Sequence, residues 1–196
     1  SAAIMQALAS QAQDIFFPPG TYLVQDCLVD KNNKRLFGTK ARIKSPKEAG
    51  IGFILSGLDL TIEGLDFCTS GASGGEPSGF IQVEASARDI SIRNCGFIGR
   101  YSAIRGSSLL SEADNPTVRA RRITIEHNDF GNLVRPLYLF NMDQVTITHN
   151  TFHDAINDAI RLRRMTGKVI ISQNHFRDIG SSSSNNTRDF IDTCHS

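Results

Sequence analysis

Two aspartates precede equivalent apolar segments in the second half of the chain. Asp158 lies two residues before Ile160, and Asp189 lies two residues before Ile191. If these segments are neighbouring strands, the two carboxylates lie about 5 Å apart. That separation suits the acid and the nucleophile of retaining glycoside hydrolysis. The alternative interpretation is that each aspartate closes the turn before its strand, as Asp commonly does.

A second set of candidate residues follows the same kind of segment. The residue after an inward apolar residue points to the opposite face of a strand. On four successive segments this gives the column Arg105, Tyr138, Arg161 and Asp192, and two residues further along the column Ser107, Phe140, Arg163 and Cys194. Aromatic faces stack on sugar rings, and arginine forks bind carboxylate or sulfate through paired hydrogen bonds.

These columns predict a groove that binds an acidic sugar. We expect the substrate to be bound by Arg105, Tyr138, Phe140, Arg163 and Asp192. The chemistry is assigned to Asp158, Asp189 and Arg161. The competing interpretation is that a loop covers the aromatic rings, that the arginines only solvate a surface, and that Arg161 and Asp192 form a weak surface ion pair.

The distribution of charge favours an acidic partner of a particular kind. The 196 residues carry 21 Lys and Arg against 20 Asp and Glu, so the net charge of +1 argues against binding nucleic acid through bulk positive charge. Arginine is nevertheless concentrated in the second half, at Arg119, Arg121, Arg122, Arg135, Arg161, Arg163 and Arg164. No apolar stretch reaches the roughly 20 residues of a membrane helix, and no signal peptide is visible. We therefore expect a polysaccharide partner, with neither nucleic acid nor membrane.

The histidines and cysteines do not predict a metal site. His127 and His149 occupy equivalent positions in the repeat described below, which indicates a polar stack at a bend; a role as general base is the alternative. The four cysteines form no CxxC pair and are expected to be thiols, with a bond between Cys68 and Cys95 as the alternative. Motifs of zinc proteases, serine hydrolases and nucleotide-binding proteins are missing from the sequence.

The elements that would position these residues come from an internal repeat. Five segments share alternating apolar residues, a polar pair and a closing Phe: LTIEGLDF from Leu60, ISIRNCGF from Ile90, ITIEHNDF from Ile123, VTITHNTF from Val145 and VIISQNHF from Val169. Alternation with period two is typical of a strand with one buried face. A second short apolar run follows each Phe, and no segment of the repeat has a helical period. Repeats at this spacing indicate a solenoid, and here a parallel β-helix.

Stacked coils would place equivalent side chains in ladders along the core. We expect a stack of Phe67, Phe97, Phe130, Phe152 and Phe176. A second ladder is expected from Asn128, Asn150 and Asn174 at a bend, where Asn tolerates a left-handed backbone and bonds to its copies. These asparagines are interpreted as structural.

The beginning of the chain makes the prediction more specific. Residues 2–12 have apolar residues at spacings of four, which predicts a helix that covers the first coil. FFPPGTYLV then follows, and after it the strands that end in NxF. This combination resembles the pectate-lyase-like superfamily of right-handed parallel β-helices. The resemblance implies an all-β, right-handed, single-stranded parallel β-helix with an N-terminal capping helix, formed by residues 1–196 as one domain with coils over 15–196.

The resemblance implies a carbohydrate-active protein without selecting the reaction. Lyases of this superfamily remove the proton next to a uronate carboxylate while Arg, or calcium held by Asp, neutralises the developing charge. Here Arg161 or Arg105 would hold the uronate, and Asp158, Asp189 and Asp192 are the candidate acid or cation-binding groups. We expect that no cofactor is required, and the resemblance implies Ca²⁺ as the alternative. Hydrolysis and epimerisation are alternatives, and so is a non-catalytic tailspike shaft, adhesin stalk or glycan-binding module.

The last residues, FIDTCHS, lie inside an expected strand with no polar cap. Because a solenoid end needs a cap for solubility, we expect a longer protein, or an end covered by further domains or by another copy, as in a trimer if the protein is a tailspike. The superfamily places such a protein outside the cell, on the cell surface or on a virion.

Overall fold

A coil of short parallel strands, closed at one end by a helix, makes up the protein. The computed structural model describes residues 2–45, 50–69, 78–99, 102–106, 118–180 and 190–194. The helix is α1 (Ala2–Ala9). The strands of the described residues are β1 (Asp14–Phe17), β2 (Gly20–Leu23), β3 (Cys27–Val29), β4 (Lys34–Ser45), β5 (Gly50–Leu55), β6 (Leu58–Thr69), β7 (Ser78–Val83), β8 (Arg88–Arg93), β9 (Gly96–Ile98), β10 (Ser102–Gly106), β11 (Ala120–Glu126), β12 (Asp129–Gly131), β13 (Leu137–Phe140), β14 (Met142–Thr148), β15 (Thr151–His153), β16 (Ile160–Arg163), β17 (Thr166–Ser172), β18 (His175–Arg177) and β19 (Ile191–Cys194).

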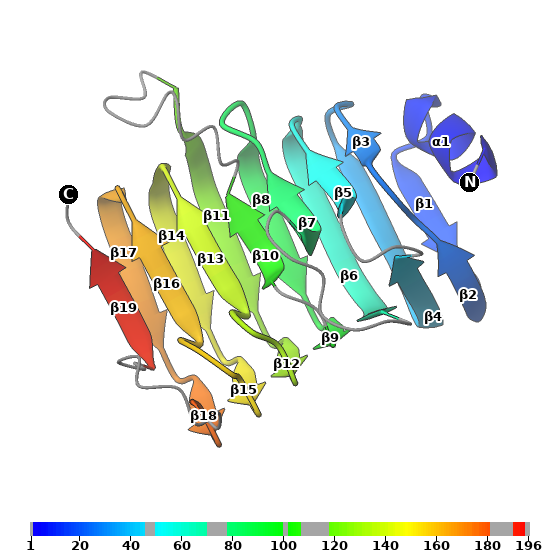
Figure 1. Cartoon of the computed structure of the whole chain (residues 1–196). Helices are drawn as coiled ribbons and strands as arrows, with labels where there is room; N and C mark the ends of the chain where they lie inside the picture. Colours follow the sequence, from blue (N-terminus) through cyan, green and yellow to red (C-terminus); the bar gives the residue numbers. More distant parts are fainter. Residues whose placement is uncertain are drawn as a thin grey trace.

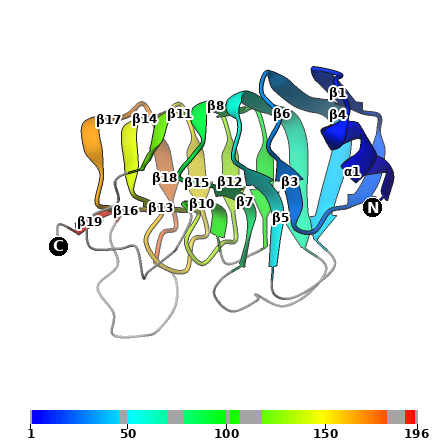
Figure 2. The same cartoon turned by 90° about the horizontal axis from the view of Figure 1, so that it is seen from above.

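The strands form two hydrogen-bonded sheets in which every pair is parallel. One sheet has seven strands in the order β19-β16-β13-β10-β7-β5-β3, and the other has twelve. In Figures 1 and 2 the coils succeed one another from the N-terminal helix to β19, and β8, β11, β14 and β17 face the layer of β7, β10, β13 and β16. The predicted parallel β-helix is confirmed, because each strand pairs with the equivalent strand of the next coil.

The twelve-stranded sheet bends along its length and so supplies two faces of the coil. Strands β4 and β6 run through the bend, whereas later coils divide there into β8 and β9, β11 and β12, β14 and β15, and β17 and β18. The five repeats are in the predicted register: Leu60 pairs with Ile90, Ile90 with Ile123, Ile123 with Val145, and Val145 with Val169.

The predicted phenylalanine stack runs through the core. The ring centroids of successive phenylalanines from Phe67 to Phe176 are 4.8, 5.0, 4.8 and 5.0 Å apart, and the planes differ by only 8–9°. Phe130 and Phe152 are fully buried, whereas Phe176 in β18 is partly exposed. The stack therefore holds the coils in register and is less well covered at its last member.

The bend before each of these strands is the asparagine corner, which consists of Gly64–Leu65, Asn94–Cys95, His127–Asn128, His149–Asn150 and Gln173–Asn174. The first residue of each pair has a positive φ, from 52° at Asn94 to 67° at Gly64. The second residue forms the predicted ladder: the backbone N–H of Asn128 donates to Oδ1 of Asn150 at 3.0 Å, and the N–H of Asn150 donates to Oδ1 of Asn174 at 2.9 Å. These bonds satisfy buried backbone groups at a sharp bend, which confirms the structural interpretation of the asparagines.

The capping helix is confirmed but is shorter than predicted. Helix α1 ends at Ala9 instead of continuing to Ala12, and it buries Ile4 and Leu8 over the first coil. The Oγ of Ser10 donates to the carbonyl of Ala7 at 2.7 Å and so terminates the helix. Nζ of the buried Lys34 donates to the carbonyls of Ser10 and Ala12, which draws this segment away from the helical path.

The cysteines described here are thiols rather than a disulfide. Cys27, Cys68 and Cys95 are all free. Burial raises the pKa of the Cys95 thiol to about 12. Cys95 takes the place of an asparagine at the corner, so it is a packing residue and not a nucleophile.

A cluster of charges on the outer face of the first coils should make stability depend on pH. Glu63 accepts hydrogen bonds from Arg35 at 3.0 Å and from Arg93 at 3.3 Å. Burial acts to raise the pKa of Glu63, but the hydrogen bonds and charges of the two arginines outweigh it and lower that pKa below 4.5. A carboxylate with a lowered folded-state pKa stabilises the fold above its unfolded pKa and loses that effect as the pH falls through the folded value.

We therefore expect Glu63→Gln to lower the free energy of unfolding at pH 7 by about 1 kcal/mol or less, because both arginines are well exposed. Urea titrations at several pH values measure this difference. It should shrink as the pH falls below the unfolded-state value of about 4.5, and a difference that stays constant down to pH 2.5 would contradict the assignment.

Candidate functional site

The parallel register brings the predicted columns together on the outer face of the seven-stranded sheet. Arg105 pairs with Tyr138, Tyr138 with Arg161, and Arg161 with Asp192. In the second column Phe140 pairs with Arg163, and Arg163 pairs with Cys194. Ser107 and Asp189 lie outside the described residues. The sheet itself therefore aligns side chains that are more than 80 positions apart in the sequence.

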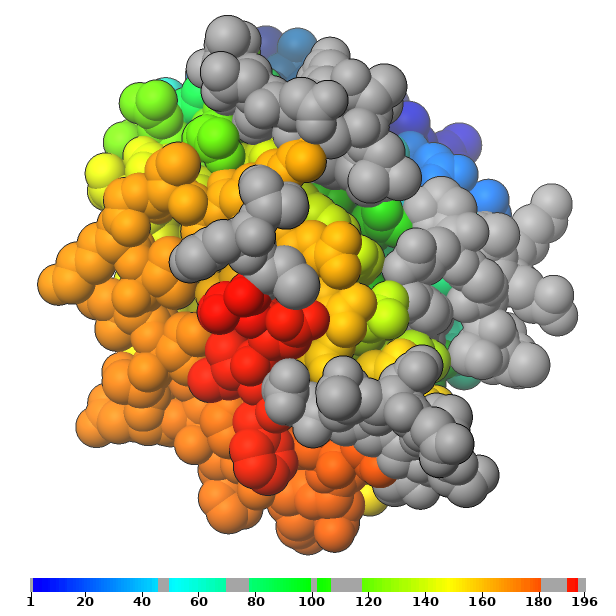
Figure 3. Space-filling view, turned by 60° about the vertical axis from the view of Figure 1, so that its left-hand side comes forward, coloured from blue at the N-terminus to red at the C-terminus, as the bar shows by residue number. Residues whose placement is uncertain are grey.

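Arg161 lies at the centre of an ion-pair network. Its Nη2 is 2.5 Å from Oδ2 of Asp158, and its Nε is 2.9 Å from Oδ2 of Asp192. Burial acts to lower the pKa of Arg161, but the two carboxylates outweigh it and raise that pKa. In Figure 3 the red atoms of β19, which carries Asp192, lie beside the orange-yellow atoms of β16. The guanidinium already engages two carboxylates, so it is less available to an acidic sugar than the sequence predicted.

Tyr138 is surrounded by the guanidinium groups of three arginines. The guanidinium carbons of Arg135, Arg161 and Arg163 lie 5.3, 5.9 and 6.0 Å from the centroid of its ring. The Phe140 ring lies 4.0 Å away, tilted by 58°. All five side chains are partly exposed. We call Arg135, Tyr138, Phe140, Arg161 and Arg163 the tyrosine surface; it combines an aromatic wall with a surplus of positive charge.

Two of the predicted site residues are much more deeply buried than the sequence suggested. Arg105 was expected to point into solvent, but it is only 4% exposed. Its Cγ and Cδ run across Gly79, where a Cβ would lie 3.6 and 3.4 Å from them. The missing side chain at Gly79 thus makes room for the arginine stem, which places Arg105 beside the tyrosine surface as a covered positive charge rather than a free clamp.

Asp158 is the second of these residues. It is 2% exposed, and Oδ2 lies 3.9 Å from Nε of Arg135 in addition to its contact with Arg161. A carboxylate held between two guanidinium groups positions them and has little access to a substrate. The predicted pairing with Asp189 lies outside the described residues.

Sequence reasoning did not assign Arg135 to the site. Arg135 stands three residues before Tyr138, as Asp158 stands three residues before Arg161, so the two belong to one column on neighbouring coils. The same alignment of the repeats places Arg135 two residues before Leu137, as it places Asp158 two residues before Ile160. The sequence prediction did not include Arg135 because it considered only carboxylates at this position of the column.

The carboxylates of this site do not fit the Ca²⁺ that the superfamily resemblance implied. Asp158 and Asp192 both face the guanidinium of Arg161, which occupies the place a cation would take. Among the residues that the structure describes, His, Cys, Asp and Glu nowhere form a group of three able to hold a metal ion.

Comparisons with known proteins identify the fold. No model of a protein family matches the chain, and no curated protein sequence matches it significantly. Among solved structures, PfbA, a surface adhesin of Streptococcus pneumoniae, is similar with a TM-score of 0.57 at 14% identity, over 89% of this chain and 57% of that one. The chain thus spans a little over half the length of this neighbour. The similarity to this neighbour agrees with the parallel β-helix fold of the chain.

Two enzymes have weaker similarity. An alginate lyase from Paenibacillus has a TM-score of 0.49 at 10% identity, over 90% of this chain and 95% of that one. The A-module of the mannuronan C-5 epimerase AlgE6 from Azotobacter vinelandii has a TM-score of 0.44 at 15% identity, over 88% of this chain and 70% of that one.

In the described residues, no helix is long and apolar enough to cross a membrane.

Proposed function

We propose that the chain is a carbohydrate-binding β-helix protein whose tyrosine surface binds an acidic polysaccharide. The observation that carries this proposal is the ring of Arg135, Arg161 and Arg163 around the partly exposed Tyr138. A partner of this kind lies outside cells, so we also propose a secreted or surface location. A fold does not select a function, and the proposal therefore rests on the site.

Charge and geometry together favour an acidic ligand over a neutral one. The tyrosine surface and its immediate neighbours contain the four arginines Arg105, Arg135, Arg161 and Arg163 against the carboxylates Asp158 and Asp192, which leaves a net charge of +2. Asp158 and Asp192 both contact Arg161, so Arg163 is the guanidinium best placed to meet a carboxylate or sulfate group. The aromatic pair supplies the apolar face that a sugar ring needs.

The same arrangement supports a non-catalytic binding module more strongly than it supports hydrolysis. Hydrolysis by the predicted aspartates needs Asp158 to reach the scissile bond, whereas Asp158 is buried between two arginines.

The phenol of the partly exposed Tyr138 favours one catalytic alternative. A hydroxyl beside several arginines could move the proton next to a uronate carboxylate while an arginine neutralises the charge. Elimination or epimerisation is therefore the second candidate function.

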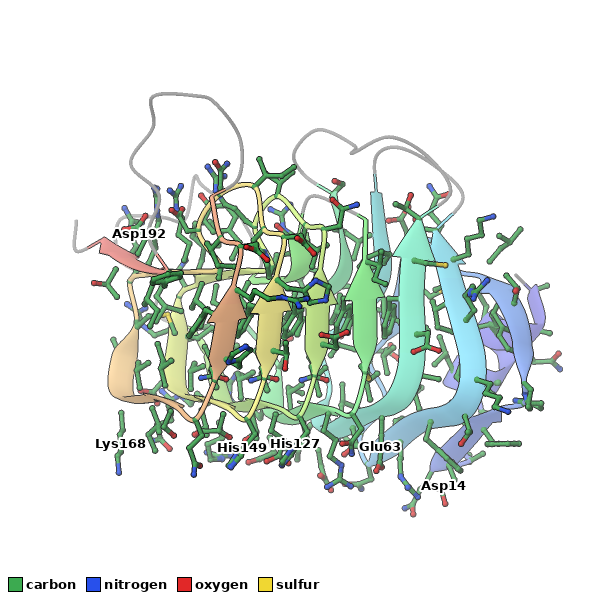
Figure 4. All side chains as sticks on the ribbon, turned by 90° about the horizontal axis from the view of Figure 1, so that it is seen from below. Asp14, Glu63, His127, His149, Lys168 and Asp192 are labelled. Atoms are coloured by element: carbon green, nitrogen blue, oxygen red, sulfur yellow. The ribbon has the colours of Figure 1, made fainter. Side chains whose placement is uncertain are left out.

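Binding is tested with Arg163→Gln in native gels that contain polygalacturonate, alginate or a sulfated glycan. Loss of one charge-assisted contact should weaken binding about tenfold or more. The matched control is Lys168→Gln, which removes an equally positive charge from exposed Lys168 in β17, on the edge of the molecule away from Asp192 in Figure 4. Equal binding by wild type, Arg163→Gln and Lys168→Gln would contradict the proposal.

Catalysis is tested separately on the same polymers. A lyase releases both ultraviolet-absorbing unsaturated ends and reducing ends, a hydrolase releases only reducing ends, an epimerase changes the sugar without cleavage, and a binding module does none of these. Tyr138→Phe keeps the aromatic wall and removes the hydroxyl. It should preserve binding and abolish any elimination or epimerisation.

A further inference from the structure

A hollow on another side of the molecule has a different chemical character. It lies along the asparagine corner, has a volume of about 620 Å³, and is open to solvent. Its polar lining is formed mainly by Asp66, Asn94, His127, Asp129, His149 and Thr151. We call it the histidine groove. None of the residues of the tyrosine surface lines it.

The groove follows the axis of the coil rather than a single strand. Strands β6, β9, β12 and β15 bring Asp66, Gly96, Asp129 and Thr151 into one outward column. Gly96 leaves the column open, because a side chain there would lie 3.0 Å from Oδ1 of Asp66. Four coils at about 4.8 Å per step give a trough roughly 14 Å long, which suits an extended ligand of a few linked units.

The opposite wall of the groove is made by the corner residues with positive φ. His127 and His149 have φ values of 55° and 58° and are exposed. Their rings stack at 4.7 Å with planes 18° apart, so their facing surfaces are occupied and their edges remain for hydrogen bonding. Figure 4 shows the two rings side by side on the lower edge of the molecule, away from Asp192.

The chemistry of the lining selects the kind of ligand. Asp66 and Asp129 carry negative charge, and no lysine or arginine lines the groove among the described residues, which disfavours an acidic ligand. The imidazole edges, the Asn94 amide and the Thr151 hydroxyl both donate and accept hydrogen bonds, and the carboxylates accept them. The hydroxyl groups of a neutral sugar also donate and accept hydrogen bonds, so they complement these side chains. Their bonds to carboxylates are of the stronger, charge-assisted kind.

Two other ligand classes fit less well. A metal ion needs several ligands that converge on one point, and no such group exists among the described residues. A flat aromatic ligand would have only the outer face of each imidazole to stack on, because the inner faces of the two rings lie against each other.

We propose that the histidine groove is a second glycan-binding site, which takes an uncharged, hydroxyl-rich oligosaccharide. It is independent of the tyrosine surface, since it lies on other strands and has the opposite charge. A protein with both sites can engage an acidic polymer on one side and a neutral polymer on the other.

The chain supplies its own conservative substitutions for a test. Asn94 and Gln173 occupy the position of the histidines on neighbouring coils with φ values of 52° and 55°. His127→Asn and His149→Gln therefore remove a ring without disturbing the bend. Asp129→Asn removes a charge at nearly constant shape.

Binding is measured in native affinity gels that contain galactomannan, mixed-linkage β-glucan or, as a cationic comparison, chitosan. Wild type should be retarded by at least one of the two neutral polymers, and the double variant His149→Gln/Asp129→Asn should bind about tenfold more weakly or worse. His127→Asn should also weaken binding, and thermal melts check that each variant is folded. Retardation by chitosan alone, by neither neutral polymer, or equally by wild type and the double variant would overturn the proposal.

One further arm separates this site from the tyrosine surface. Arg163→Gln should lose affinity for polygalacturonate and keep its affinity for the neutral polymer, and His149→Gln/Asp129→Asn should show the reverse. A variant that weakens both interactions equally would show that there is one site and not two, and would overturn the present inference.

Discussion

Phe130→Ala is expected to lower the free energy of unfolding by about 3–5 kcal/mol. The ring is fully buried and stacks on Phe97 at 5.0 Å and on Phe152 at 4.8 Å, so its loss leaves a cavity bounded by two rings that the sheets hold in place. Hydrogen-bonded strands on both sides prevent the coil from collapsing into the gap. The loss should also reduce cooperativity, because each coil contacts mainly its neighbours.

Phe176→Ala is the matched control for this prediction. It removes the same ring from the same stack, but Phe176 is partly exposed and has Phe152 at 5.0 Å and Phe190 at 5.6 Å as its aromatic neighbours. Its cost should be about half as large, near 2 kcal/mol. Urea unfolding followed by circular dichroism measures both. Equal costs at the two positions would contradict the assignment of Phe130 to a closed core.

The second large effect is expected from Asp158→Asn. The substitution keeps the shape of the side chain and removes its charge, which leaves the partly buried guanidinium of Arg161 with Asp192 as its remaining carboxylate in the network. Removal of one partner of a buried pair costs several kcal/mol, and we expect about 3 kcal/mol here because Asp192 stays in place.

Asp192→Asn provides the comparison on the same guanidinium. Asp192 is 20% exposed at its side chain against 2% for Asp158, so its loss should cost about 1 kcal/mol or less. Denaturant titrations of both variants give the two values. If Asp158→Asn were within about 0.5 kcal/mol of wild type, Asp158 would not be the carboxylate that anchors the network.

The fold was predictable from the sequence because the solenoid repeats its own signal. Period-two alternation, a polar pair and a closing Phe recur five times, and each copy predicts the same strand, bend and strand. The end of the capping helix was predicted less exactly, because it depends on a side chain distant in the sequence. Nζ of Lys34 donates to the carbonyls of Ser10 and Ala12. No local pattern in residues 2–12 encodes that contact.

The candidate site was only partly predictable. The column from Arg105 to Asp192 followed from register alone, and the structure has it. The exposure of these side chains did not follow from the register, because it depends on the neighbouring side chains. Gly79 makes room for the stem of Arg105. Asp158 is buried against Arg135 and Arg161. The sequence predicted either a polar stack at a bend or a general base for His127 and His149, but not the groove, because the open position at Gly96 depends on the register of neighbouring coils.

At the asparagine corner the backbone makes the same turn whichever side chain points outward. The same turn is made by four residue types, at Gly64, Asn94, His127, His149 and Gln173, while the residue after each one packs into the core. Replacement at one coil should leave its neighbours folded. Outward side chains at the corner can therefore change one coil at a time during evolution while the path of the backbone is kept.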